Sequence, residues 1–303
     1  MKKRIVIALA ATCVLSVQAQ EMPKSYQSVL DTLGKKGDYK ANVLKVNIPR
    51  SDLTVTVDGV ATPTPFGFGG WLAMTKGDGG RDVMMGDLVL LEDEVNPVMS
   101  ALLDNGLEVT ALHNHFFFDE PRIFYMHVMG HASPADLAKK VKPAIDLIGH
   151  VASGHPKTSG AATLQPGKID TAKIAKIVGY EGEQNGAVYK ITVGRDDLKL
   201  KEMGAMINAR MGLNTWASFV GNDQDAAIAG DVAMLGKEVQ PVLKMLRSHG
   251  LAVVAIHHHM IGTSPAVIFL HYWGKGPAEK LATGFKAALD QLGKGSASAK
   301  TAH

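Results

Sequence analysis

The sequence carries one histidine-rich segment twice. Residues 107–130 read LEVTALHNHFFFDEPRIFYMHVMG, and residues 251–274 read LAVVAIHHHMIGTSPAVIFLHYWG. Each segment has a pair of histidines separated by one residue, and a third histidine after eleven more residues. The two segments also share their first leucine, a central proline and their last glycine, while most other positions differ. A repeat of this length predicts two similar structural units.

The internal match extends beyond the histidine segments. Paired positions recur in the same order along the chain, among them Gly34/Gly179, Lys45/Lys190, Arg50/Arg195, Trp71/Trp216, Gly86/Gly230, Asp87/Asp231, Glu94/Glu238 and Gly106/Gly250. We therefore divide the chain into a first copy at 24–152 and a second at 169–294. Residues 153–168, SGHPKTSGAATLQPGK, have the composition of a flexible linker, and we expect the polar tail 295–303 to be disordered.

Hydrophobic periodicity predicts the same order of elements in both copies. In the first copy it predicts helices at 25–33, 94–104 and 133–148, and strands at 43–48, 53–57, 71–74, 87–91, 108–115 and 122–129. Ser133, Pro134 and Asp136 form a typical helix start. Strands that follow one another with helices between them favour antiparallel pairing, with the helices on one face. The predicted fold class is α+β, with two tandem sheet-plus-helices units related by a pseudo-two-fold axis.

The amino terminus has the pattern of a secretory signal peptide. Lys2, Lys3 and Arg4 precede an apolar run at 5–17, and Val17-Gln18-Ala19 is a typical cleavage site, so residues 1–19 are predicted to be removed. The apolar run is about 13 residues, shorter than the roughly 20 that span a bilayer. We expect a periplasmic protein. Its mature part has no cysteine and so no thiolate ligand or disulfide.

Composition and motifs exclude several classes of partner and chemistry. The net charge of +3 is spread along the chain, which argues against nucleic-acid binding. No later apolar stretch is long enough to span a membrane. The sequence has no nucleophile elbow, P-loop or dinucleotide-binding motif in the required context. KGDGGRD at 76–82 predicts a tight hairpin turn.

The repeated histidines predict a metal site. Alternate residues of a strand share a face, so His113 and His115 are expected about 6.6 Å apart on one side. His127, on the next strand, joins them if the register allows. Three imidazoles can bind a divalent transition metal at about 2.0–2.1 Å, zinc first among them. The predicted ligands are His113, His115 and His127 in the first copy, and His257, His259 and His271 in the second.

Candidate catalytic residues lie near these histidines in the sequence. Glu94 and its counterpart Glu238 are the first duplicated choice for a fourth ligand or general base, and Asp87 with Asp231 is the second. Glu120 and Arg122 flank the histidines in the first copy only, where they predict a base and an anion clamp. The first copy is therefore the expected active centre. The alternative is that the histidines and acids are structural. In that case the glutamate at the start of the helix interacts favourably with the helix dipole.

The string GDLVLLEDEVNPVMSALLDNGLEVTALHNHFFFDEPRIFYMHVMG and its partner in the second copy resemble the LppY/LpqO family, also called domain of unknown function 1259. The likeness covers nearly all of the chain after the leader. It implies an exported bacterial protein of duplicated architecture and implies no particular reaction.

Three functions fit these observations. The first is a metal-dependent periplasmic hydrolase that acts on a small molecule, and the second is a non-catalytic periplasmic protein that binds a metal or small ligand. The third is a structural envelope protein with buried histidines. A catalytic metal keeps an open coordination position beside a cleft, whereas a sequestering site is closed by four protein ligands. The sequence leaves the substrate and the oligomeric state open.

Overall fold

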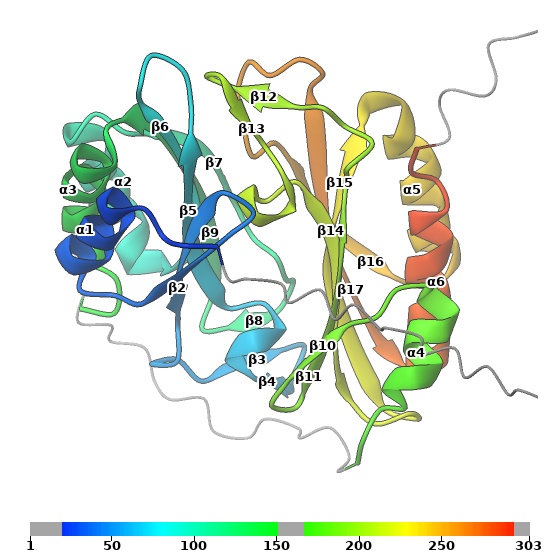
Figure 1. Ribbon diagram of the computed structural model, residues 1–303. Coiled ribbons are helices and arrows are strands. Elements are labelled where there is room, and N and C mark those ends of the chain that lie inside the picture. Colours follow the sequence, from blue (N-terminus) through cyan, green and yellow to red (C-terminus); the bar gives the residue numbers. More distant parts are fainter. Residues whose placement is uncertain (1–19, 151–166, 294–303) are drawn as a thin grey trace, which may run out of the picture.

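The computed structural model describes residues 20–150 and 167–293 (Figure 1). The predicted signal peptide, nearly all of the predicted linker and the predicted tail lie outside the described residues. The rest forms four layers, in which two sheets face each other and three helices cover the outer face of each sheet (Figure 1).

The first copy forms a six-stranded antiparallel sheet. Its strand order is β1 (Gly37–Lys40), β2 (Val43–Pro49), β5 (Gly69–Lys76), β6 (Asp82–Leu91), β9 (Ile123–Ala132) and β7 (Glu108–His113). The covering helices are α1 (Lys24–Leu33), α2 (Glu92–Asp104) and α3 (Pro134–Ile145).

The second copy repeats this arrangement strand for strand. Its sheet order is β10 (Glu183–Asn185), β11 (Val188–Gly194), β14 (Asn214–Gly221), β15 (Ala226–Leu235), β17 (Val267–Gly276) and β16 (Ala252–His257). The helices are α4 (Thr171–Val178), α5 (Gly236–Ser248) and α6 (Ala278–Leu289). The predicted α+β class and the predicted duplication are confirmed.

Each copy sends a short arm across the interface onto the other copy. The first arm holds β3 (Val55–Val57), β4 (Val60–Thr62), β8 (Asp119–Glu120) and the 3₁₀ turn Thr64–Phe66; the second holds β12 (Lys201–Glu202), β13 (Ala205–Met206) and the 3₁₀ turn Ala209–Met211. Phe66 of the first arm meets Trp273 edge to face, with ring centroids 5.8 Å apart. Met211 of the second arm packs in one cluster with Ala73 and Met85. The arms bind the copies to each other through apolar contacts.

The strands at the centre are apolar on both sides because both sides are buried. In β6, Met84 and Leu88 face the helices, whereas Met85 and Val89 face the other copy. Strands buried on both faces read as continuous hydrophobic runs, as DVMMGDLVLL does. Asp87 shares the parity of Met85 and Val89, so its side chain is on the face that meets the second copy.

Most predicted elements appear within a few residues of their predicted bounds. The predicted hairpin at 76–82 joins β5 to β6, and the backbone amide of Gly77 donates to the carbonyl of Arg81. The short strands β1, β4 and β8 had not been predicted. β7 ends at His113 and not at His115, so His115 lies in the loop beyond the strand. Among the described residues no helix is long and apolar enough to cross a membrane.

A buried ion pair fixes the start of α2 in the first copy. The guanidinium of Arg50 lies 2.5 Å from the carboxylate of Glu94, and the two side chains are 2% and 0% exposed. Glu94 also accepts hydrogen bonds from the backbone amides of Leu91 and Gly149. Arg195 and Glu238 repeat the pair in the second copy. These ion pairs and hydrogen bonds hold the carboxylates of both glutamates at the helix layer.

We therefore expect Glu94→Ala to destabilise the fold. Removal of Glu94 leaves the buried Arg50 guanidinium with the half-exposed Asp52 as its remaining counter-charge, and breaking a buried pair in this way costs about 3–5 kcal/mol. Urea denaturation followed by circular dichroism measures the loss. Glu92→Ala, an exposed change in the same helical turn, should cost about 1 kcal/mol or less. A folded Glu94→Ala protein of unchanged stability would contradict this role.

Candidate metal centre

The six repeated histidines meet at the interface between the two sheets. His127 on β9 and His271 on β17 point to the inner faces, as their neighbours Tyr125, Phe269 and Trp273 do. The register places Asp87 beside His127 and Asp231 beside His271. The other four histidines come from the ends of β7 and β16 and from the loops that follow. The expectation that the third histidine joins the same face as the first two is met in both copies.

Each of the six imidazole rings has its nearest imidazole neighbour in the other copy. The ring centroids of His113 and His257 are 3.6 Å apart, and these two residues are the same repeat position. The remaining pairs are His115 with His271, at 3.6 Å, and His127 with His259, at 4.0 Å. The pairing follows the pseudo-two-fold axis, so the six rings form one cluster.

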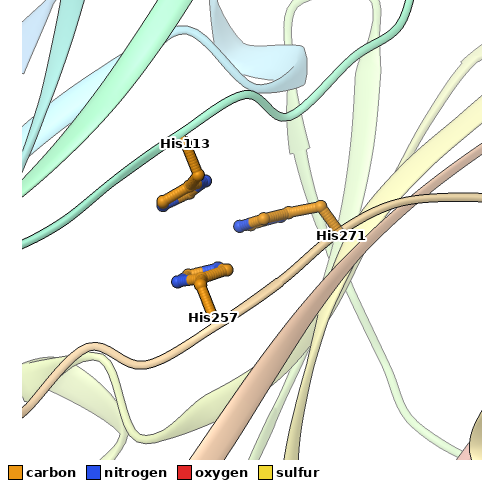
Figure 2. A group of neighbouring side chains, drawn as sticks. All are labelled: His113, His257 and His271. Carbon is orange, nitrogen blue, oxygen red and sulfur yellow. The ribbon is translucent and has the colours of Figure 1, made fainter.

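Ligand nitrogens converge in two groups, both of which cross the copies. One group is His113, His257 and His271, and the other is His127, His257 and His259; within each the nitrogens all lie within 4.8 Å of one another. Figure 2 shows the rings of the first group turned toward a common centre. The sequence had predicted one complete trio in each copy. The structure corrects this, because the trios are mixed and His257 belongs to both.

Backbone carbonyls determine which ring nitrogen is free. The Nδ1 of His113 lies 3.4 Å from the carbonyl of Asn114, and that of His257 lies 3.3 Å from the carbonyl of His258. The Nδ1 of His271 lies 3.3 Å from the carbonyl of Gly230. A carbonyl oxygen only accepts, so each Nδ1 carries the proton and each Nε2 presents its lone pair. Such a hydrogen bond behind the ring is usual for metal-binding histidines.

The repeated glycines beside the aspartates have a packing reason. A Cβ on Gly230 would overlap the carbonyl of Trp216 and the hydroxyl of Tyr272. A Cβ on Gly86 would lie 2.9 Å from the carbonyl of Trp71. Because these strands approach so closely, the Gly86 backbone can hydrogen-bond to His127 and that of Gly230 to His271.

Burial keeps the imidazoles neutral. It lowers the pKa of His113 to about 4 and that of His257 to about 3. The pKa values of the four fully enclosed rings, those of His115, His127, His259 and His271, lie well below the ordinary value for the same reason, and neighbouring rings add to the effect. Neutral imidazole is the form that binds metal ions.

Several buried nitrogens have no hydrogen-bond partner among the described residues. They are both ring nitrogens of His115 and the Nε2 atoms of His257, His259 and His271. In addition, the Nε2 atoms of His113 and His127 lie 2.9 Å apart. Buried polar atoms without partners are costly, and native proteins rarely keep several in one place. A cation held by these lone pairs satisfies them, so the donor set fits a transition metal.

A polar cavity of about 530 Å³ adjoins the cluster. Its lining includes Asp87, Asp231, His115, His259 and His271. Burial raises the pKa of Asp87 to about 8, and the pKa of Asp231 also lies well above its ordinary value, through burial and its proximity to Asp87. The carboxyl groups beside the histidines are therefore those of the two aspartates, the pair that sequence analysis had placed second.

The three predicted catalytic residues lie elsewhere. Glu94 is held at the helix layer by Arg50, as described above. Glu120 is exposed in β8, where it pairs with Thr56 of the first arm. Arg122 is exposed after that strand, and its charge lowers the pKa of Asp119. Within residues 20–150 and 167–293, none of the three has an ion pair or hydrogen bond with the six histidines.

The fold and this cluster define a duplicated α+β protein whose candidate site is shared by its two copies. A family model described as Domain of Unknown Function (DUF1259) matches residues 27–147 and again residues 172–291. The chain belongs to this family, and the two matches correspond to the two halves of the structure. No curated protein matches the sequence.

Two solved structures show weak similarity. EtuB from Clostridium kluyveri is 10% identical, with 85% of this chain and 91% of that chain covered and a TM-score of 0.21. A double-ringed trimeric shell protein of the RMM microcompartment is 12% identical, with 70% and 82% covered and a TM-score of 0.16. These scores are too low to indicate a shared fold.

The buried imidazoles predict acid sensitivity of the metal-free protein. Their folded pKa values lie below the unfolded value of 6.5, so the unfolded chain binds protons more tightly. The stability they contribute is complete above pH 6.5 and falls as the pH drops toward about 4. The raised pKa values of Asp87 and Asp231 have the opposite effect on stability, because these two carboxyl groups favour the folded state as the pH falls. Six imidazoles outweigh two carboxyl groups.

Thermal melting in chelator from pH 7.5 to pH 4.5 measures this effect. We expect a falling midpoint, and we expect His258→Asn, an exposed change to the residue found in the first copy, to leave the profile unaltered. A midpoint independent of pH over this range would contradict the description of the six rings as buried and neutral.

Proposed function

We propose that this protein binds one divalent transition metal ion, zinc first among the candidates, between its two copies. The observation that carries the proposal is the convergence of buried, neutral imidazoles, among which the Nε2 atoms of His257 and His271 have no hydrogen-bond partner in the described residues. An all-nitrogen set of this kind suits zinc, copper, nickel or iron. His257 belongs to both groups and offers one free nitrogen, so one ion per chain is the expected stoichiometry.

The proposal includes export to the periplasm. The basic residues, apolar run and Val17-Gln18-Ala19 of the first nineteen residues support it. A centre built from imidazoles and without cysteine is compatible with an oxidising compartment.

Metal-dependent hydrolysis of a small molecule is the function that the geometry supports best. Each candidate group has three histidines, which is the ligand number of many catalytic zinc sites, and one histidine of each group, His271 or His259, lines the polar cavity. The histidines of either group would hold the ion, which would supply Lewis-acid polarisation of a carbonyl or phosphoryl group and a more acidic water. Asp87 and Asp231 lie where the cavity meets the histidines and would orient the water, and a bound cation would favour the ionised carboxylate that accepts its proton.

Non-catalytic metal binding is the second candidate, and one observation favours it. Six imidazoles gather where three suffice, and a ligand set drawn from more than three would close the coordination sphere. A closed site would hold the ion firmly and offer no position to a substrate.

Elemental analysis of protein purified without a histidine tag tests metal binding. We expect about one equivalent of metal in the wild type and a loss in His257→Ala at least as large as that in His113→Ala, because His257 belongs to both groups. His258→Asn serves as the control. Greater loss from His113→Ala, with His257→Ala unaffected, would restore the first copy as the sole centre. Absence of metal after incubation with zinc, copper, nickel and iron would overturn the proposal.

A panel of chromogenic carboxylic and phosphate esters distinguishes a hydrolase from a non-catalytic metal-binding protein. A hydrolase should lose turnover on chelation and regain it with zinc. Asp87→Asn should lower kcat by about 10²–10⁴-fold while metal content is retained, since the amide cannot accept a proton. A different result would favour the non-catalytic metal-binding protein: metal is bound and exchanges slowly into chelator, but no ester shows metal-dependent turnover.

A further inference from the structure

The cavity beside the histidines holds two lysines that nothing in the proposed chemistry uses. Lys45 on β2 and Lys190 on β11 are the same repeat position, and both line this cavity. The Lys45 ammonium lies 4.7 Å from the ring centroid of Trp71, and that of Lys190 lies 4.1 Å from Trp216. The tryptophan faces hold the two ammonium groups in place.

Asp87 and Asp231 line the same cavity and attract the two lysines, but neither lysine is in direct contact with a carboxylate among the described residues. No ion pair or hydrogen bond joins Lys45 or Lys190 to any of them, in contrast to Lys76, whose ammonium lies 3.0 Å from Asp82. Burial lowers the pKa of Lys190 to about 8, and the nearby Lys45 adds to this shift. The two ammonium groups therefore share one cavity without a direct salt bridge, although acidic residues also line it, and an anion bound between them would supply the contacts that they lack.

The strand order places these lysines at a distance from the histidines. The strands β2, β5, β6 and β9 are successive neighbours, about 4.8 Å apart, so the backbones of β2 and β9 are separated by about 14 Å. Asp87 and Trp71 lie on the strands between them. The cavity volume of about 530 Å³ is in the usual range for small-molecule sites, about 300–1,000 Å³.

We infer that the cavity binds a small organic anion whose carboxylate or phosphate group lies between the ammonium groups of Lys45 and Lys190. The remainder of the molecule extends past Asp87 and Asp231 toward the histidines. Thr192 and Asn214, which also line the cavity, supply hydrogen-bonding groups for its polar substituents. This inference names the substrate class of the proposed enzyme and rests on that proposal for the reaction, but anion binding itself requires only the cavity.

Titration of the metal-free protein tests the inference, with tryptophan fluorescence as the signal because Trp71 and Trp216 contact the two lysines. The probes are inorganic phosphate, malonate and, as a neutral compound, glycerol. We expect a saturable change with at least one anion, weakened by added salt, and none with glycerol. Saturation by malonate alone identifies a carboxylate site, and saturation by phosphate alone identifies a phosphate site.

Lysine variants locate the binding. Lys45→Met and Lys190→Met should each raise Kd by about tenfold or more, because each removes a charge-assisted hydrogen bond. Lys190→Arg should retain binding, and Lys199→Met, an exposed change outside the cavity, should match the wild type. Circular dichroism checks folding, and Lys45→Gln and Lys190→Gln replace any methionine variant that unfolds. The inference is overturned if neither anion saturates the wild type, or if folded variants of both lysines bind as the wild type does.

The inference and the proposed function can fail separately. Anion binding that persists in a metal-free His257→Ala protein supports the cavity site whatever the metal result is. Normal metal content in a wild type that binds neither anion overturns the cavity site and leaves the metal proposal standing.

Discussion

The burial of the two inner sheet faces against each other is the interaction on which the rest of the structure depends. Each copy's helices cover only one side of its sheet, so the other side needs a partner. The clusters that fill the interface combine both copies, for instance Phe116 with Trp273 and Met85 with Met211. Because the histidines lie inside this contact, their rings are mostly shielded from water and remain neutral. The same packing that stabilises the fold therefore prepares the ligands.

Sequence periodicity predicted the elements well because the long strands and helices are amphipathic or continuously apolar. The two-residue strands β8 and β13 are too short to show a period, and they were missed. Alternation also predicted that His127 shares a face with His113. It could not predict the mixed trios, because a period of two specifies which face a side chain occupies and not what covers that face. The stacking of His113 on His257 is a property of the packed pair of copies.

The two duplicated acids, Glu94 and Asp87, differ in whether local structure alone accounts for a carboxylate at that position. Glu94 is the third residue of α2, a position from which a glutamate reaches back to the preceding backbone amide, and it does so at Leu91. Asp87 stands inside the otherwise apolar run of β6. A helix start has its own need for an acid, whereas an apolar strand buried on both faces has none. The acid without a structural explanation is the stronger functional candidate, and the structure places it beside His127.

A shared centre also explains where the two copies have diverged. Neither copy brings three ligand nitrogens together from its own histidines among the described residues, so a change at any of these positions would affect the common site. Glu120 and Arg122 lie in an exposed turn away from the cluster, and their counterparts Ser264 and Ala266 have lost the charges. The copies thus differ at the exposed turn and agree at the histidines, Asp87/Asp231 and Lys45/Lys190. A centre belonging to one copy would have left the other copy's histidines free to vary.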